Sequence, residues 1–223
     1  MLVIEIGKAD HGMQTKLYTM TETTLDQTAI EDCAAILRAG GLVAFPTETV
    51  YGLGASAFEA LSCARIFEVK HRPADKPLLC HLASLEQAEE LAYLTDTARA
   101  LICRYTPGPL TLVLKKKPCV PDIVSAGGDT VGLRFPANPI CRALLQACGC
   151  PVAAPSANLS SHPSPVTATP VIGSFYGEID AILDGGKSAL GTPSTIISLA
   201  DGKPALIRAG ALPEAEWKEI LTL

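Results

Sequence analysis

The chain has 223 residues, of which 48% are hydrophobic, and a formal net charge of −5 at pH 7. This length can bury a sizeable core in one domain, with at most a small appendage. The acidic balance argues against a protein coated with basic residues for nucleic acid but leaves room for a local basic patch. The longest apolar runs, such as 42–45 and 110–114, are too short to span a bilayer, and residues 1–10 have no apolar signal block. We therefore expect a cytoplasmic protein without a membrane segment.

Apolar periodicity predicts helices and strands that alternate along most of the chain. In chain order, the predicted elements are helix 25–38, strand 42–45, helix 60–70, strand 78–82, helices 85–93 and 97–105, strands 110–115 and 130–134, helix 139–148, strand 152–154, strands 179–183, 195–199 and 205–207, and helix 213–221. This order predicts an α/β fold with a central, mixed sheet covered by helices.

Lysine and arginine are concentrated in the loop that follows the helix 60–70. Lys70, Arg72 and Lys76 lie in a segment whose shape is restricted by Pro73 and Pro77. Three cations in a stiff loop suit a polyanion, most simply a nucleoside triphosphate. The alternative is a basic helix C-terminus, where the cations only offset the helix dipole.

Residues 45–54 are predicted to leave a buried strand and enter a glycine-rich loop. Thr47, Thr49 and Tyr51 alternate, so an extended segment would point them to one side. The glycines that follow would let the backbone approach a ligand closely. The alternative is an ordinary connection whose hydroxyl groups bond to the backbone.

Polar residues also follow two later strands. Ser156 and Asn158 can reach phosphate oxygens or the waters of a magnesium ion, or they can form an ordinary turn. Arg134 ends a strand and offers a fork for a carboxylate, or it is a surface arginine that pairs with a nearby acid. His81 lies in an apolar strand, where a lone histidine is more often a core residue than a ligand. Because ligands of open α/β sheets bind beyond the strand ends, these loops are expected to line one cleft.

The sequence contains cations and polar donors but no evident nucleophile or metal site. Its eight cysteines include no Cys-x-x-Cys pair, and the closest two are Cys148 and Cys150. The cysteines at 33, 63, 80, 103 and 141 fall in apolar patterns and are expected to be reduced core residues. Such a site fits chemistry that works by positioning two anionic reactants, as in nucleotidyl transfer.

Taken together, seven motifs resemble the YrdC-type threonylcarbamoyl-AMP synthases over roughly residues 25 to 212. In order, they are Pro46-Thr-Glu-Thr-Val-Tyr-Gly-Leu-Gly54, Lys70-x-Arg72-Pro-x-x-Lys76-Pro-Leu, Pro107-Gly-Pro-Leu-Thr111, Val131-Gly-Leu-Arg134-x-Pro136, Ala154-Pro-Ser-Ala-Asn158, Ser194-Thr-Ile-Ile197 and Leu206-Ile-Arg208. The resemblance implies an open, twisted sheet in a three-layer architecture with a positively charged cavity. The sequence differs from the family pattern at Ala209, where the family usually has proline.

The resemblance also implies a reaction. L-threonine and bicarbonate form a carbamate, which attacks the α-phosphate of ATP, bound with Mg²⁺, to give L-threonylcarbamoyl-AMP and pyrophosphate. Threonylcarbamoyltransferase proteins then move the threonylcarbamoyl group to an adenosine of tRNA, and a weak contact of this chain with tRNA is compatible with this role.

The resemblance assigns roles residue by residue. The catalytic set is Lys70, Arg72, Ser156 and Asn158. The ATP contacts are Arg72, Lys76, Thr130, Ser156, Ser164 and Arg208. The threonine contacts are Thr49, His81, Arg134, Ala154 through its backbone, and Ser194. It assigns no metal ligand.

We divide the chain into a lead-in, 1–24, and one catalytic domain, 25–223. Longer relatives append a second domain, so the chain is either a single-domain member or stops short of that domain. An RNA-binding module is a rival interpretation, which the acidic charge and the scarcity of aromatic residues disfavour. Another rival is the carbamoyl-transferring domain of a hydrogenase-maturation protein, but those proteins carry zinc-finger cysteine pairs beside it.

Overall fold

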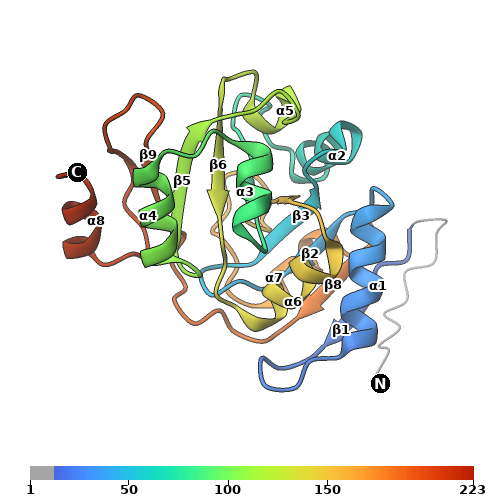
Figure 1. Ribbon diagram of the computed structural model, residues 1–223. Coiled ribbons are helices and arrows are strands. Elements are labelled where there is room, and N and C mark those ends of the chain that lie inside the picture. The colour runs from blue at the N-terminus through green and yellow to red at the C-terminus, as the bar shows by residue number, and fades with distance from the viewer. Residues whose placement is uncertain (1–12) are drawn as a thin grey trace.

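A mixed sheet of ten strands forms the centre of this computed structural model, in which residues 13–223 are described (Figure 1). The elements are β1 Lys16–Thr19, α1 Gln27–Arg38, β2 Val43–Phe45, β3 Gly52–Ser56, α2 Ala60–Lys70, β4 Leu79–His81, α3 Leu85–Leu91, α4 Asp96–Tyr105, β5 Leu110–Lys115, α5 Asp122–Ser125, β6 Thr130–Arg134, α6 Pro139–Cys148, β7 Val152–Ala153, α7 Ala168–Phe175, β8 Ala181–Asp184, β9 Thr195–Ser198, β10 Ala205–Arg208 and α8 Glu214–Ile220. No helix within residues 13–223 has the length and apolar character needed to cross a membrane.

The strand order is β1-β8-β2-β3-β7-β4-β6-β5-β9-β10. Four neighbouring pairs are parallel, namely β1–β8, β8–β2, β4–β6 and β5–β9. The pairs β2–β3, β3–β7, β7–β4, β6–β5 and β9–β10 are antiparallel. The predicted mixed α/β sheet is therefore confirmed.

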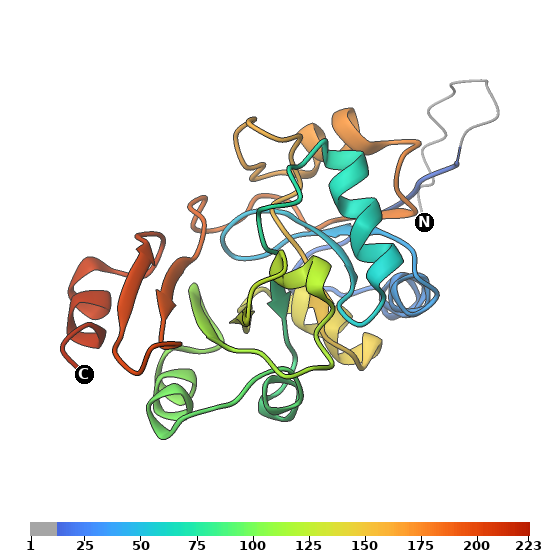
Figure 2. The same cartoon turned by 90° about the horizontal axis from the view of Figure 1, so that it is seen from above.

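Helices cover both faces of the sheet, which makes three layers (Figure 2). Helices α1 and α6 pack in one hydrophobic cluster, and helices α2, α3, α4 and α7 pack in the other. Strand β2 shows why both faces are apolar: Val43 and Phe45 pack in one hydrophobic cluster with α1 and α6, and Ala44 between them packs in the other. Alternate side chains of a strand point to opposite faces, so a strand buried on both faces is apolar at every position.

Helix α1 shows how the apolar periodicity led to a correct prediction. Asp26 caps the helix by accepting a hydrogen bond from the backbone N of Ala29 at 3.1 Å, and Gly40 with φ 85° follows its end. Five apolar residues of the helix are buried: Ala29, Ile30, Cys33, Ala34 and Leu37. The other predicted helices match α2, α3, α4, α6 and α8 within one to two residues at most ends.

Residues 16–19 lie in the predicted lead-in but form β1, an edge strand parallel to β8. The Thr15 hydroxyl fixes the start of this strand by donating to the carbonyl of Ile179 at 2.6 Å. Four residues with mixed burial give too short a pattern to detect in the sequence. The first twelve residues of the lead-in lie outside the described part of the chain.

The prediction that residues 45–54 enter a glycine-rich loop is wrong from Gly52 onward. Residues 52–56 form β3, a fully buried strand near the middle of the sheet. Its glycines allow other groups to approach the strand closely, because a Cβ atom on Gly54 would lie 2.6 Å from Val152 Cγ1 and 2.7 Å from Phe45 Cε1.

The sequence analysis also missed helices α5 and α7. Helix α7 contains Pro170 and Gly173, which hide its apolar periodicity.

We expect Gly54→Ala to lower the free energy of unfolding by about 1–3 kcal/mol, because the new methyl group overpacks a site between two core side chains. Gly173→Ala is the matched control. It adds the same methyl group in an exposed position of α7 with nothing within 4 Å, and should raise the free energy of unfolding by up to about 1 kcal/mol. Urea unfolding of both variants tests this; equal effects would contradict the close contact at Gly54.

Candidate active site

A cavity of about 340 Å³ lies over one face of strands β4, β6, β5 and β9. Leu79 and His81 of β4, and Gly132 and Arg134 of β6, line it. The residues between them, Cys80 and Leu133, point to the opposite face, which α3 and α4 cover (Figure 2). The cavity is thus built on a sheet face, whereas the sequence analysis expected it beyond the strand ends.

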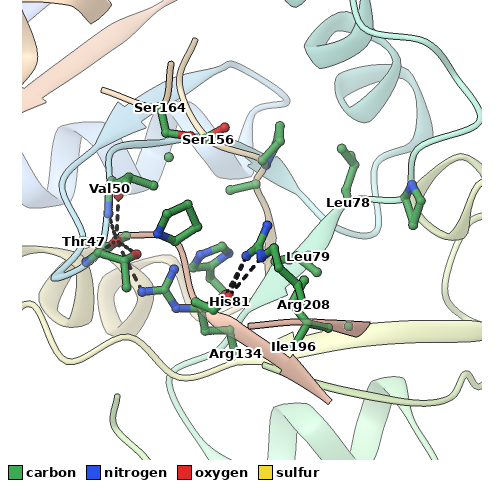
Figure 3. Close-up of a pocket in the computed structure, with 18 of the residues that line it drawn as sticks. Thr47, Val50, Leu78, Leu79, His81, Arg134, Ser156, Ser164, Ile196 and Arg208 are labelled. Carbon is green, nitrogen blue, oxygen red and sulfur yellow. Dashed lines mark hydrogen bonds between the residues drawn. The ribbon is translucent and has the colours of Figure 1, made fainter. Parts of the chain in front are cut away.

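The cavity gathers most of the predicted site residues. Those that line it are Thr49, Arg72, His81, Thr130, Arg134, Ala154, Ser156, Ser164, Ser194 and Arg208. Ser156 and Ser164 lie on one side of it in Figure 3, and Arg134 and Arg208 lie on the other. The lining includes three arginines and, among the described residues, no carboxylate. Its chemistry therefore favours anions.

Arg134 forms a buried ion pair with Glu48. Its Nη2 donates to Glu48 Oε1 at 2.9 Å, and the two side chains are 5% and 11% exposed. Glu48 Oε2 accepts from the backbone N of Ala137 at 3.0 Å. Arg134 Nε is buried and has no hydrogen-bond partner within residues 13–223. The expected acid partner is therefore present, but Arg134 is buried and not a surface arginine, and Glu48 contacts only its Nη2.

Glu48 is the site residue that the sequence analysis did not single out. It is the only charged residue between Arg38 and Glu59, in an otherwise apolar and hydroxyl-rich stretch. An isolated charge in a segment that should be buried was the signal, because a buried charge needs a partner. The structure supplies that partner from β6, a strand far away in the sequence.

The loop that carries Glu48 is not extended. Thr47 and Thr49 turn toward each other, with their hydroxyl oxygens 2.9 Å apart, and Thr47 donates to the carbonyl of Val50 at 2.6 Å. Tyr51 also lines the cavity, but its hydroxyl donates away to the carbonyl of Gly186 at 2.7 Å. The threonine hydroxyls are thus held by local bonds at the cavity wall.

Arg208 belongs to the edge strand β10 and contacts the loop before β9. Its Nε and Nη2 both donate to the carbonyl of Ser194, at 3.1 and 2.8 Å. The Ser194 hydroxyl is also 2.8 Å from that of Thr111 on β5. Burial, and then the charge of Arg134, lower the pKa of Arg208. An anion bound between these two guanidinium groups would be attracted by both charges and would reduce their mutual repulsion.

His81 is both a core residue and a cavity residue. Its side chain is 3% exposed and meets the ring of Phe45 edge to face at 6.0 Å. Burial, and then the charge of Arg134, lower its pKa to about 3, so the imidazole is neutral at pH 7. Its Nδ1 is buried without a partner among the described residues. A neutral, unpartnered ring nitrogen can bond to a polar group of a bound ligand.

Lys70 lies beneath the cavity wall and does not line it. Its ammonium donates to the carbonyl oxygen of Ser156 at 2.5 Å and to that of Asn158, and so holds the loop that carries both residues. Burial, and then the charge of Arg72, lower the pKa of Lys70 to about 7. The hydroxyl of Ser156 donates to Oδ1 of Asn158. Three of the four predicted catalytic residues thus form one connected cluster.

Arg72 is the fourth, and it reaches the cavity from the loop after α2. Its Nη2 donates to the carbonyl of Pro77 at 3.1 Å, which keeps the guanidinium against the loop, and its Nε is buried without a partner within the described chain. Burial lowers its pKa. Lys76 is exposed on the same loop and lies outside the lining.

Mg²⁺ would enter such a site with its nucleotide. Residues 13–223 contain no cluster of three or more histidine, cysteine, aspartate or glutamate side chains that could hold a metal alone. Mg²⁺ commonly takes its ligands from phosphates and waters with few from protein. The hydroxyl of Ser156 lies at the cavity wall and fits that supporting role, whereas Asn158 lies outside the lining and its Oδ1 accepts from Ser156.

Comparison with known proteins identifies relatives along most of the chain. A family model named Sua5_yciO_yrdC and described as telomere recombination matches residues 35–210. The chain is 48% identical over 198 residues to a threonylcarbamoyl-AMP synthase of Pyrococcus abyssi, covering 88% of this chain and 58% of the relative. It is 42% identical over 205 residues to the Bacillus subtilis protein of that name, covering 90% and 58%. The chain thus spans 58% of the length of these two curated relatives.

Solved structures agree with the sequence relatives. The structure of P. abyssi Sua5 complexed with L-threonine matches with a TM-score of 0.90 and 46% identity, over 93% of this chain and 61% of that one. Escherichia coli YciO matches with a TM-score of 0.81 and 27% identity, over 88% and 96%. The open mixed sheet with its helices is therefore the fold of these proteins.

We expect the Glu48–Arg134 pair to be strongly coupled. Glu48→Leu or Arg134→Met alone leaves one buried charge without its partner and should lower the free energy of unfolding by about 3–5 kcal/mol. The double variant removes both charges and should be far more stable than the sum of the two losses predicts. Urea unfolding of the four proteins gives the coupling free energy, and additive losses would contradict a pair that depends on mutual compensation.

Proposed function

Because the chain belongs to the Sua5/YciO/YrdC family, we propose that it makes L-threonylcarbamoyl-AMP and pyrophosphate from L-threonine, bicarbonate and ATP. The observation that carries the proposal is the set of unpartnered polar atoms at the cavity: Arg72 Nε, His81 Nδ1 and Arg134 Nε. Buried polar groups without partners are costly, so a polar ligand that reached these atoms from the cavity beside them would stabilise the site. The chain and the named relatives share the segment that carries these residues.

Threonine would bind where Arg134, His81 and Ser194 meet. The free part of the Arg134 guanidinium takes the carboxylate, because Glu48 occupies only Nη2. Thr49, Ser194 and the backbone of Ala154 contact the rest of the amino acid. The P. abyssi relative with bound L-threonine supports a threonine site in this fold.

The triphosphate of ATP would lie toward the opposite side, near Ser156 and Ser164 (Figure 3). Arg72, Thr130 and Arg208 reach the same cavity, and Lys76 extends from the loop beside it. Lys70 acts through the loop that it holds, by keeping Ser156 and Asn158 in place. Mg²⁺ bound with ATP would offset phosphate charge in this arrangement.

The reaction then needs orientation and charge stabilisation rather than a protein nucleophile. The neutral amino group of threonine attacks the carbon of bicarbonate, and the bicarbonate hydroxyl leaves as water with a proton of the amine, so that a carbamate forms. A carbamate oxygen attacks the α-phosphorus of ATP as the bond to the β-phosphate oxygen breaks, and pyrophosphate leaves. Arginines close to both reactants offset the charge on the phosphoryl group. The product would pass to threonylcarbamoyltransferase proteins that modify tRNA.

Pyrophosphate release measures this activity directly. We expect the purified chain with Mg²⁺ to release pyrophosphate only when ATP, L-threonine and bicarbonate are all present, because the attacking carbamate forms only from the last two. Mass spectrometry of the mixture should detect threonylcarbamoyl-AMP. Release that continues unchanged without threonine or bicarbonate would refute the proposal.

Mutations should affect the binding of threonine and the binding of ATP separately. Arg134→Lys keeps the charge but loses the fork, and should weaken threonine binding by about 1–2 kcal/mol with little effect on ATP. Arg72→Ala should weaken ATP binding at least about tenfold with little effect on threonine. Lys76→Ala should weaken ATP binding less than Arg72→Ala does, because Lys76 is exposed. Calorimetric titration tests all three, and loss of ATP affinity in Arg134→Lys would contradict this division.

A further inference from the structure

Two cysteine thiols lie side by side outside the cavity, at the connection from α6 to β7. Cys148 ends α6, and Gly149 caps the helix with φ 68°. This left-handed turn brings the next residue back toward the helix, so Sγ of Cys150 is 3.3 Å from Sγ of Cys148. A glycine is suited to this position because other residues rarely adopt a left-handed conformation.

The surroundings make the two thiols unequal. Cys148 is 3% exposed, whereas Cys150 is half-buried and also lies 3.8 Å from Oγ of Ser56. Arg38 of α1 donates to the carbonyl of Ala147 at 2.6 Å, which holds its charge at this end of α6. The hydrogen bond from Cys148 lowers the pKa of Cys150, with smaller contributions from Ser56 and Arg38, against the opposing effects of burial and of the charge of Glu90. The same hydrogen bond, together with burial, raises the pKa of Cys148.

The other six cysteines differ from this pair. Four are buried, and burial raises the pKa of each one: Cys33, Cys63, Cys80 and Cys141. Cys103 and Cys119 are exposed, which corrects the expectation of a core position for Cys103. Among the described residues, only Cys148 and Cys150 have sulfur atoms within hydrogen-bonding distance of each other.

We propose that Cys148 and Cys150 form a redox-active dithiol that a peroxide converts into an intrachain disulfide. The thiolate of Cys150 attacks one oxygen of hydrogen peroxide; an S–O bond forms, the O–O bond breaks, and the hydroxide that leaves takes up a proton to become water. The sulfur of Cys148 then attacks the sulfenic sulfur of Cys150. The S–S bond forms as the S–O bond breaks, and the hydroxyl leaves as water with the proton of Cys148. Both sulfurs are oxidised, and one peroxide is reduced to two waters.

The test begins with the wild-type chain, fully reduced and then treated with hydrogen peroxide. Remaining thiols are alkylated, and the protein is digested with trypsin. Cleavage after Arg142 and Lys187 releases one peptide that contains Cys148 and Cys150 and no other cysteine. We expect this peptide to lose the mass of two hydrogen atoms, to carry no alkyl group, and to regain both thiols with dithiothreitol. A peptide that remains doubly alkylated while Cys103 or Cys119 is oxidised would overturn the proposal.

Variants then separate the roles of the two thiols. Cys150→Ser removes the attacking thiolate and should slow oxidation of the peptide at least about tenfold, since the remaining thiol is buried and ionises poorly. Cys148→Ser removes the second thiol, so Cys150 should gain oxygen atoms rather than form a disulfide within the peptide. The matched control Cys103→Ser/Cys119→Ser should form the 148–150 disulfide at the wild-type rate, within about twofold.

Wild-type protein alone decides the proposal if a variant fails to fold. Phenylarsine oxide, a reagent that binds two adjacent thiols at once, provides a second measurement. We expect one equivalent to protect Cys148 and Cys150 together from alkylation and to leave Cys103 and Cys119 reactive. Binding at any other pair of cysteines, or protection of neither thiol, would contradict the pairing.

Discussion

Glu48 connects three segments of the chain beside the cavity. Its carboxylate oxygens accept from Arg134 at the end of β6 and from the backbone of Ala137 before α6. Its own backbone carbonyl accepts from Leu190 at 2.8 Å, in the loop that leads to Ser194. One residue thus joins three segments that lie far apart in the sequence. The arginine that is proposed to bind the substrate is oriented by a charge that is never itself part of the lining.

In this arrangement the protein itself offsets part of the charge of several cations around one cavity. Arg72, Arg134 and Arg208 lie around one space, and Lys70 lies beneath its wall. Glu48 compensates Arg134 directly, while backbone carbonyls of Pro77 and Ser194 accept from the other two arginines. Carbonyl acceptors reduce the cost of burying a cation but carry no net charge. The remaining positive field is available to a ligand that brings negative charge.

The sequence predicted the parts of the fold with a clear period and the parts of the site with distinctive side chains. Helix α1 repeats apolar residues at helical spacing, and Arg72, Arg134 and Ser156 stood out because charge and hydroxyl groups followed predicted elements. Strand β3 was missed because its glycines resemble a loop, although they serve the close approach of Phe45. The position of Lys70 beneath the cavity wall also could not be predicted. Its ammonium donates to backbone carbonyls, which every residue has, so no side-chain pattern in the sequence indicates these bonds.

The order of strands in the sheet has a consequence for how the chain folds during synthesis. Strand β5 pairs with β9, so the partner of Leu110 is Thr195, which is synthesised much later. In the same way, β1 pairs with β8, and the partner of Lys16 is Ala181. Pairings over such separations slow folding because long loops must close first. At about 5–20 residues per second, the ribosome adds the segment between β5 and β9 over several seconds. During that time Leu110–Lys115 has an unpaired edge on one side, and an unpaired edge is a place where a strand can pair with another chain.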